Sequence, residues 1–304
     1  MRPGYALVKI HFSALQPSDK LNAKGGFPKT TFPRIPGRDY SGEVVEVDPS
    51  SGLEAWIGKQ VYGTSGSELG FTIDGPHAEF CLIPEEMLVE KPSSLSPCQA
   101  ATIGVPFTAA LRCLIRAQAS AGDIVLVLGA SGAVGSAAVK IAGALGGIKV
   151  LTASRRQEDA PSVLIGGPIT LEEQISTLTD GKGVNVVIDT VGNIDLMHAA
   201  VEQLAVRGRY VWIASPRDGS SRILHLDTFQ SYRKEIQLIG CNTALTAGDE
   251  VAEELRRLRD LFDSGKLEAS GEADIQRIKF SDAIERGYSA AKLKKNVVFD
   301  MSDS

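Results

Sequence analysis

The sequence predicts an α/β protein that combines a doubly wound parallel sheet domain with a β-rich, partly barrel-shaped domain. In residues 119–264, short apolar strand patterns alternate with helical runs, which is typical of a parallel sheet covered by helices. In the first hundred residues, strand patterns instead follow one another between Gly and Pro turns. We therefore expect a β-rich domain at 1–118 and 265–304 and a doubly wound domain at 119–264.

The strongest local pattern is an apolar strand followed by a glycine turn and a helical run. Five apolar residues at 124–128 predict a buried strand, and the glycines after it permit a tight turn and close approach to a pyrophosphate. The spacing is G-x-x-G-x-x-G rather than G-x-G-x-x-G, and an ordinary glycine turn is the alternative. The candidate dinucleotide-binding residues of this turn are Gly129, Ser131, Gly132, Ala133, Val134 and Gly135.

The other elements follow from periodicity and turn residues. Apolar residues at helical spacing predict a helix at 248–262. The segment 157–165 is too short for the usual second crossover helix, because parallel strands need about a dozen connecting residues. Further strands are expected at 6–13, 42–47, 78–83, 149–153, 184–188, 209–214 and 296–300, with one more helix at 280–291.

Composition excludes several function classes. A net charge of -5 and a pI near 5.5 argue against nucleic acid as a partner, which clustered Lys and Arg would attract. The Gly, Ala and Ser content of 124–148 fits a nucleotide fold better than a membrane span. No secretory signal pattern opens the sequence, so we expect a cytoplasmic protein. Four scattered cysteines suggest neither disulfides nor a thiolate metal cluster, and the four histidines show no ligand spacing.

The residues after the second strand of the doubly wound domain predict the cofactor. NAD-binding folds place an acid there for the ribose 2′-hydroxyl. This sequence has Ser154, Arg155 and Arg156 instead, and two guanidiniums suit a 2′-phosphate. We therefore expect NADPH, with a pair of solvated turn arginines as the alternative.

Several ordered motifs together resemble the medium-chain dehydrogenase/reductase superfamily, in its zinc-independent quinone oxidoreductase-like branch. The resemblance covers almost the whole chain and implies a Rossmann NADP-binding domain and a GroES-like catalytic domain. The segments that carry it are Pro36 to Val47, Gly75 to Phe80, Val105 to Leu111, Gly129 to Gly135, Val187 to Gly192 and Lys295 to Val298.

The resemblance also implies that no catalytic metal is bound. Zinc-dependent relatives have a Cys where this chain has Gln16, and a His-Glu pair where it has Arg38 and Asp39. The catalytic candidates implied are Gln16, Asp39 and Thr108, and the further cofactor contacts are Val191, Ala214, Ser215 and Asn296.

Structural roles remain open for several of these residues. Gln16 fits a polar turn residue before Pro17, and Arg38 and Asp39 fit an internal ion pair. Asp19 fits a helix cap or a first-turn acid, and Thr108 fits a cap as well as a cofactor contact. Tyr40 and Tyr62 are candidate proton donors, although tyrosines in strands are commonly packing residues.

The expected activity is NADPH-dependent reduction of a quinone or an α,β-unsaturated carbonyl. Without zinc there is no Lewis acid to polarise an ordinary carbonyl, so an electrophilic small-molecule acceptor fits better. The alternatives are an enoyl-thioester reductase that partners a biosynthetic synthase, and a non-enzymatic NADPH-binding sensor or structural protein. The resemblance also implies a homodimer.

Overall fold

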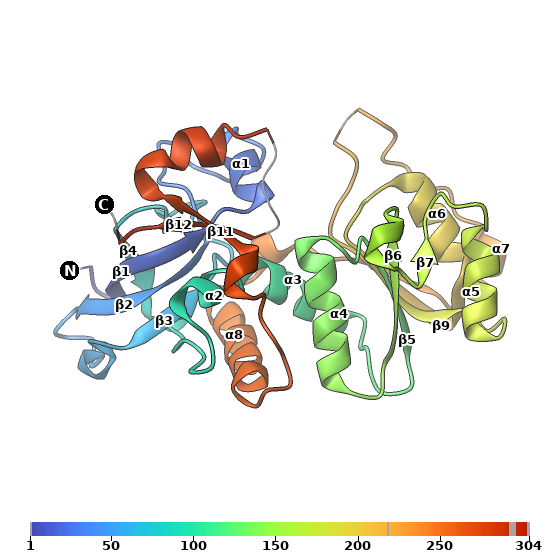
Figure 1. Cartoon of the computed structure of the whole chain (residues 1–304), viewed down its shortest axis with the longest axis horizontal. Helices are drawn as coiled ribbons and strands as arrows, with labels where there is room; N and C mark the ends of the chain where they lie inside the picture. The colour runs from blue at the N-terminus through green and yellow to red at the C-terminus, as the bar shows by residue number, and fades with distance from the viewer. Residues whose placement is uncertain (1, 218, 292–295, 303–304) are drawn as a thin grey trace. The chain divides into compact units, whose positions relative to one another are not determined.

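The computed structural model describes residues 2–217, 219–291 and 296–302, and it divides the chain into two compact units. Unit 1 comprises 1–108 and 243–304, and unit 2 comprises 109–242. The predicted boundaries differ, because the helix α8 (Gly248–Asp263) was expected in the doubly wound domain and belongs to unit 1 (Figure 1). A buried hydrogen bond of 2.6 Å from the Tyr62 hydroxyl to the Leu255 carbonyl attaches α8 to this unit.

Unit 1 is built around a mostly antiparallel sheet in which β1 is central. The order is β11, β12, β1, β2, β3, with β4 paired to β1 outside this path, and only β11 and β12 are parallel. The C-terminal strands thus lie beside the N-terminal one, which confirms the β-rich domain with a returning C-terminal segment (Figure 1). The strands are β1 (Tyr5–Ala14), β2 (Asp39–Val47), β3 (Gln60–Gly63), β4 (Phe80–Pro84), β11 (Ile275–Lys279) and β12 (Asn296–Asp300).

The core of unit 1 follows from the two-residue period of its strands. Ala6, Val8 and Ile10 of β1 point to one face and are buried with Val44 of β2 and Phe299 of β12. The expected helix at 280–291 is a short 3-10 turn followed by a π-helix. Apart from short 3-10 turns, the described helices of this unit are α1 (Pro17–Ala23), α2 (Pro97–Ala101), the first turn of α3 (Gly104–Arg116), α8 and the π-helix Ala283–Tyr288.

Unit 2 contains a six-stranded parallel sheet within the described residues. Its order is β10, β9, β8, β5, β6, β7, so β5 lies between the strand that follows it in sequence and β8. This reversal is the switch point at which open α/β sheets bind ligands. The strands are β5 (Ile124–Leu128), β6 (Lys149–Ser154), β7 (Val163–Leu164), β8 (Val184–Asp189), β9 (Leu204–Trp212) and β10 (Gln237–Gly240).

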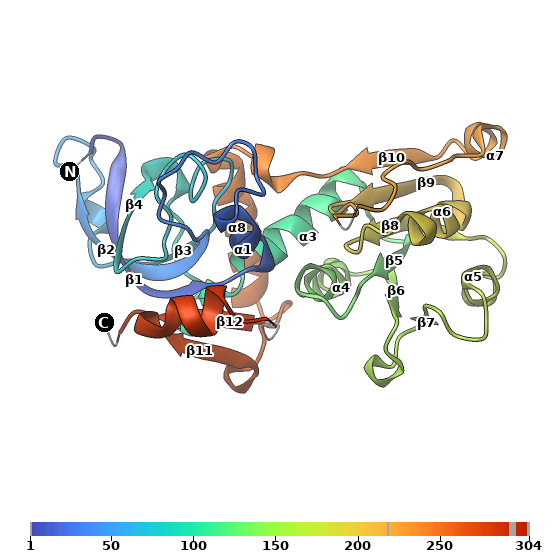
Figure 2. The ribbon, with the colours of Figure 1, turned by 90° about the horizontal axis from the view of Figure 1, so that it is seen from above.

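Helices cover both faces of this sheet, which confirms the doubly wound prediction. α4 lies against one face, and α5 and α6 lie against the other (Figure 2). The sheet is buried between them, as the fully buried Leu126, Val187 and Tyr210 indicate. The helices are α4 (Ala133–Leu145), α5 (Leu171–Thr179), α6 (Ile194–Glu202) and α7 (Thr228–Arg233).

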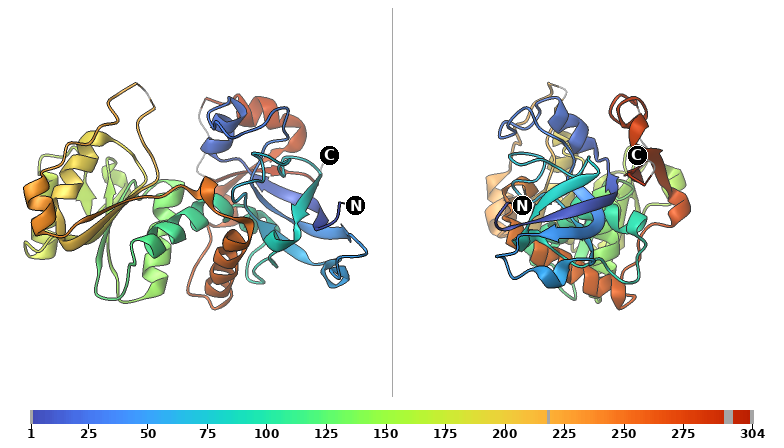
Figure 3. Two further views of the ribbon diagram at one scale, coloured as in Figure 1. Left: turned by 180° about the vertical axis from the view of Figure 1, so that it is seen from behind. Right: turned by 90° about the vertical axis from the view of Figure 1, so that its left-hand side faces the viewer.

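Two connections of unit 2 depart from a regular doubly wound fold. A single 3-10 turn, Gln157–Asp159, joins β6 to the two-residue β7, which confirms the shortened crossover. The strand predicted at 209–214 begins earlier, at Leu204, and ends at Trp212. The described residues between it and α7 form a long loop without regular structure (Figure 3).

Candidate functional site

A buried polar cluster in unit 1 brings together two of the three predicted catalytic residues. Gln16 follows β1 and precedes α1, and Asp39 opens β2. The Gln16 side-chain amide donates a hydrogen bond of 2.9 Å to Oδ2 of Asp39. The other carboxylate oxygen accepts from the Thr64 hydroxyl at 2.5 Å and from the backbone N–H of Val105 at 2.8 Å. Three donors therefore fix the Asp39 carboxylate in place.

Arg38 forms an ion pair next to this carboxylate, but its partner is Asp19. Nε of Arg38 lies 2.7 Å from Oδ1 of Asp19, and both side chains are at most 5% exposed. The other carboxylate oxygen of Asp19 accepts the backbone N–H of Gln16 in a capping box, which confirms Asp19 as a first-turn acid of α1. The alternative of an Arg38–Asp39 ion pair is wrong in its choice of partner.

Burial sets the charge states of this cluster. It raises the pKa of the Asp39 carboxyl to about 6, although the Arg38 guanidinium and the Thr64 and Val105 hydrogen bonds act in the opposite direction. Burial alone would lower the pKa of Arg38, but the carboxylates of Asp19 and Asp39 outweigh it and raise that pKa. Two carboxylates therefore share one guanidinium in a site closed to water.

Thr108 and Asn296, also in unit 1, each donate a hydrogen bond to another residue of that unit. Thr108 lies inside α3, and its hydroxyl donates to the Gly104 carbonyl at 2.9 Å, so the predicted helix cap is wrong. The Asn296 amide at the start of β12 donates to the Ser270 hydroxyl at 3.0 Å. Lys295, the first residue of the last motif, lies outside the described residues.

The glycine turn of unit 2 has no room for side chains. Gly129 has a φ of +78°, and a Cβ on it would lie 2.6 Å from the Thr190 hydroxyl. A Cβ on Gly135 would lie 2.2 Å from the Gly129 carbonyl oxygen. Gly132 is the N-cap of α4. It has no side chain that could accept a hydrogen bond from the first N–H groups of the helix, so these groups can donate to an external acceptor. Ala133 and Val134 lie in this first turn.

Asp189, which the sequence analysis did not single out, shapes the neighbouring strand end. Its Oδ1 accepts the backbone N–H groups of Val191 and Gly192 at 2.8 and 3.1 Å, and its Oδ2 accepts the Tyr210 hydroxyl at 2.9 Å. Burial nevertheless raises the pKa of Asp189 above its ordinary value. The sequence signal that could have identified Asp189 is its position directly after the apolar residues of β8.

The turn that Asp189 holds lies next to two other strand ends. A Cβ on Gly129 would lie 2.9 Å from a Val191 methyl group, and one on Gly192 would lie 2.4 Å from the carbonyl carbon of Ala214. The structure therefore brings the glycine turn, Val191, Ala214 and Ser215 together at the carboxyl ends of β5, β8 and β9. This edge is the switch point where a doubly wound sheet binds its ligand.

Two of the three residues predicted to select the cofactor, Ser154 and Arg156, form hydrogen bonds to Asp159, which was not among the predicted site residues. Ser154 ends β6, and its hydroxyl donates to Asp159 at 2.8 Å, while Nε of Arg156 donates to the same oxygen at 3.0 Å. Arg155 has no ion pair within the described part of the chain. The hydrogen bonds from Ser154 and Arg156, together with the nearby Ser131, lower the pKa of Asp159.

The remaining polar candidates are buried and have structural roles in unit 1. Tyr40 and Tyr62 are fully buried packing residues of unit 1, as the structural alternative predicted. His77 is buried; because Nε2 donates to the Ala14 carbonyl at 3.1 Å, Nδ1 accepts from the Tyr288 hydroxyl at 2.7 Å. Across 2–217, 219–291 and 296–302, no group of three or more His, Cys, Asp or Glu side chains is placed to hold a metal ion.

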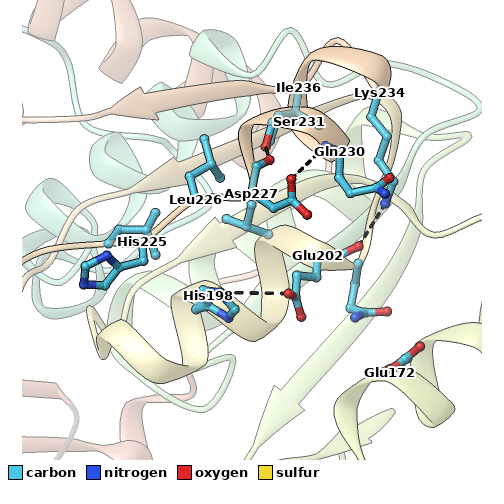
Figure 4. Close-up of a pocket in the computed structure, with 13 residues that line it drawn as sticks. Glu172, His198, Glu202, His225, Leu226, Asp227, Gln230, Ser231, Lys234 and Ile236 are labelled. Atoms are coloured by element: carbon cyan, nitrogen blue, oxygen red, sulfur yellow. Dashed lines mark hydrogen bonds and ion pairs between the residues drawn. The ribbon is translucent and has the colours of Figure 1, made fainter.

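A pocket of about 370 Å³ opens in unit 2 away from the glycine turn (Figure 4). His198 and Glu202 of α6 line it, with 3.9 Å between Nε2 and Oε1. The Lys234 ammonium donates to the Glu202 carbonyl at 3.0 Å, and His225 and Asp227 precede α7. None of the predicted cofactor-binding residues lines this pocket.

One unit has a parallel sheet with a glycine turn at its switch point, and the other is β-rich with a buried polar cluster. Together these features define the class of two-domain, nucleotide-dependent oxidoreductases. Sequence models of two domain families match the chain: "Alcohol dehydrogenase GroES-like domain" over 2–93 and "Zinc-binding dehydrogenase" over 133–260. Within the described residues, no helix has the length and apolar content needed to cross a bilayer.

Individual relatives agree with the two domain matches. The chain is 45% identical to a zinc-type alcohol dehydrogenase-like protein of Schizosaccharomyces pombe over 86% of its own length and 77% of the relative's. It is 31% identical to the quinone oxidoreductase of Pongo abelii, over 81% and 78% of the two chains. A crystal structure of an alcohol dehydrogenase superfamily protein from Novosphingobium aromaticivorans matches with a TM-score of 0.81 and 26% identity, over 99% and 92% of the chains. The chain belongs to the medium-chain dehydrogenase/reductase superfamily and is quinone oxidoreductase-like. It is an oxidoreductase with a nicotinamide cofactor.

Proposed function

We propose that this chain is a zinc-independent, NADPH-dependent oxidoreductase that transfers a hydride to a quinone or an α,β-unsaturated carbonyl. The observation that carries the proposal is the buried cluster of Gln16, Asp39 and the Arg38–Asp19 ion pair. This cluster occupies the positions at which the resemblance expects zinc ligands in metal-dependent relatives.

The residues of the cluster do not suit Zn²⁺. Zinc in proteins takes thiolate, neutral imidazole and carboxylate ligands. Arg38 instead presents a cation without an acceptor atom, and the amide nitrogen of Gln16 is a donor. The carboxylate oxygens of Asp39 are already occupied by three donors. An acceptor that needs no Lewis acid therefore fits this site best, which favours conjugated carbonyls and quinones.

The residues of unit 2 fit a nicotinamide dinucleotide. Gly129 and Gly135 allow the chain to pack into a tight turn that a side chain would disrupt, and the first turn of α4 directs N–H groups toward the place that a pyrophosphate would occupy. Arg155 and Arg156 supply positive charge for a 2′-phosphate. Val191, Ala214 and Ser215 would line the nicotinamide end. When bound, reduced nicotinamide supplies the hydride that the proposed reaction requires.

In unit 1, Asp39 acts as a positioning residue for Gln16. It holds one N–H of the Gln16 amide, and the second N–H of that nitrogen remains for the carbonyl oxygen of an acceptor. A fixed donor of this kind stabilises the negative charge that develops on the acceptor oxygen. We also keep Thr108 and Asn296 as proposed contacts to the nicotinamide end, on the basis of the family resemblance.

We further propose a homodimer and a cytoplasmic location. β10 is an edge strand of its sheet. Leu238 within it and Phe229 and Tyr232 of the preceding α7 are between 37% and 65% exposed, which favours pairing with a second copy. The four cysteines are buried thiols that form no disulfide within the described residues, which fits a reducing compartment. A strictly monomeric mass in light scattering would contradict the dimer.

The test is oxidation of NADPH, with NADH in parallel, by the purified chain in metal-free buffer. The acceptors are 1,2- and 1,4-quinones, simple enones and an enoyl thioester. We expect turnover with quinones or enones that a chelator leaves unchanged, and a several-fold loss on Gln16→Ala. Stoichiometric zinc by elemental analysis would contradict zinc independence. Turnover with the thioester alone would select an enoyl reductase, and NADPH binding without any turnover would select a non-enzymatic role.

The cofactor preference has a separate test. Replacing Arg155 and Arg156 together by Ala should raise the Michaelis constant for NADPH and leave the NADH kinetics nearly unchanged. The preference for NADPH is wrong if neither cofactor responds.

A further inference from the structure

One carboxylate lies where the proposed 2′-phosphate site needs positive charge. Oδ2 of Asp159 accepts hydrogen bonds from the Ser154 hydroxyl and from Nε of Arg156, at 2.8 and 3.0 Å. The backbone N–H of Arg156 donates in turn to the Ser154 hydroxyl at 3.1 Å. The three side chains form a closed cluster, in which the arginine assigned to phosphate already has an anionic partner.

The position of this cluster in the fold indicates which part of a ligand it would contact. Ser154 is the last residue of β6, the strand next to β5, and doubly wound folds bind the adenosine ribose at this strand end. Ser131 of the glycine turn also lowers the pKa of Asp159, so the cluster adjoins the turn that would hold the pyrophosphate. No acid stands at the strand end itself. Instead, the short crossover places an acid, Asp159, next to this strand end from a position five residues later, on the 3-10 turn Gln157–Asp159.

The two cofactor forms differ at the group that this carboxylate would meet. A 2′-phosphate carries between one and two negative charges near neutral pH and contains only acceptor oxygens when fully ionised, so Asp159 repels it and competes with it for Arg156. A ribose 2′-hydroxyl can instead donate a hydrogen bond to the carboxylate. The Asp159 side chain is 23% exposed, so a ligand can reach it, while solvent weakens the repulsion.

We propose that Asp159 is a specificity-determining residue that lowers the preference of this enzyme for NADPH, because it engages Arg156 and Ser154 and offers a ribose acceptor to NADH. The inference rests on the proposed function, since it assumes that unit 2 binds the adenosine half of the cofactor. It predicts that the unmodified chain uses both cofactors, with a smaller preference for NADPH than its two arginines alone would give.

The experiment compares two adenosine probes by isothermal titration calorimetry on the full chain. The probe 2′,5′-ADP carries the 2′-phosphate, and 5′-AMP carries the free hydroxyl. In Asp159→Asn, 2′,5′-ADP should bind about three- to tenfold more tightly, in keeping with the modest strength of solvent-exposed charge interactions. 5′-AMP should bind equally or more weakly. Adding Arg156→Met to this variant should abolish the gain.

Glu158→Gln is the matched control. It removes the same charge one residue away, from an exposed side chain that has no ion pair within the described residues. It should change both affinities by less than about twofold. Equal changes in Asp159→Asn and Glu158→Gln, or weaker 2′,5′-ADP binding in Asp159→Asn, would overturn the inference and leave the proposed reductase intact. An unmodified chain that binds neither probe would overturn both.

Discussion

In unit 1 the candidate site consists of ionised side chains removed from water, whereas in unit 2 it consists of backbone bent around glycines. Arg38, Asp19 and Asp39 are all less than 5% exposed. The turn from Gly129 to Gly135 contains no ionisable side chain, and the fold aims helix N–H groups there instead. A buried charge cluster therefore depends on every partner, whereas a backbone site depends on close packing that leaves no room for a Cβ atom. The two kinds of site should therefore fail under different substitutions.

The largest effect is expected for Arg38→Met in unit 1. This change leaves the carboxylates of Asp19 and Asp39 buried without their cation, which should lower the free energy of unfolding by about 3–5 kcal/mol. Chemical denaturation measures the loss. Adding Asp19→Asn should recover part of it, because one stranded charge is then removed.

The control for Arg38→Met is Arg207→Met, which breaks an ion pair with Glu235 whose side chains are 78% and 63% exposed. It should change stability little, because solvent screens such pairs. Equal losses in the two variants would mean that burial does not set the cost of removing a charge partner in this chain.

Gly135→Ala tests the opposite property in unit 2. The added Cβ would meet the Gly129 carbonyl oxygen at 2.2 Å, so the turn must shift, at a cost of about 2–4 kcal/mol in stability or in cofactor binding. Titration of NADPH by fluorescence should show binding weakened at least tenfold. Gly143→Ala, in the same helix with no atom within 4 Å of the new Cβ, should bind NADPH normally and match or exceed the parent in stability. Normal NADPH binding by Gly135→Ala would show that the turn can accept a side chain without losing its function.

The stability of unit 1 should depend on pH through Asp39. Burial raises the pKa of Asp39 from 3.8 to about 6, so the native state binds more protons than the unfolded state between these values. The contribution of Asp39 to the free energy of unfolding therefore falls as pH rises from about 4 to about 6, by about 2 kcal/mol. Asp39→Asn should remove this slope in denaturation curves across that range. The exposed control Glu158→Gln should retain it, and an unchanged slope in Asp39→Asn would contradict the assignment.

The smallest effects are expected from two buried tyrosine hydroxyls. Tyr210 in unit 2 donates to Asp189, which holds the turn at Val191 and Gly192, so Tyr210→Phe should cost about 1–2 kcal/mol. The Tyr40 hydroxyl in unit 1 has no hydrogen-bond partner in the described chain, and Tyr40→Phe should be neutral or slightly stabilising. Thermal denaturation distinguishes the two. A loss in Tyr40→Phe equal to that in Tyr210→Phe would show that Tyr40 has a partner, such as a bound water.

The local parts of this protein could be predicted from the sequence alone. The apolar run of β5, the glycine turn and the start of α4 are adjacent in the chain, and their residue types restrict the backbone directly. The amphipathic pattern of α8 likewise identified the helix. Its assignment to a domain was a different matter. That followed from its tertiary contacts with unit 1, which include a hydrogen bond from Tyr62, almost two hundred residues away, to the Leu255 carbonyl.

Tertiary structure decided the partners of the charged and polar residues. Sequence proximity suggested that Arg38 pairs with Asp39, but the fold presents Arg38 to Asp19 and surrounds Asp39 with donors from Gln16, Thr64 and Val105. Asp159 likewise reached Ser154 and Arg156 only through the conformation of a short 3-10 turn. Backbone geometry is a local property that residue types encode. An ion pair or a hydrogen bond depends on distance in space, which the sequence fixes only through the whole fold.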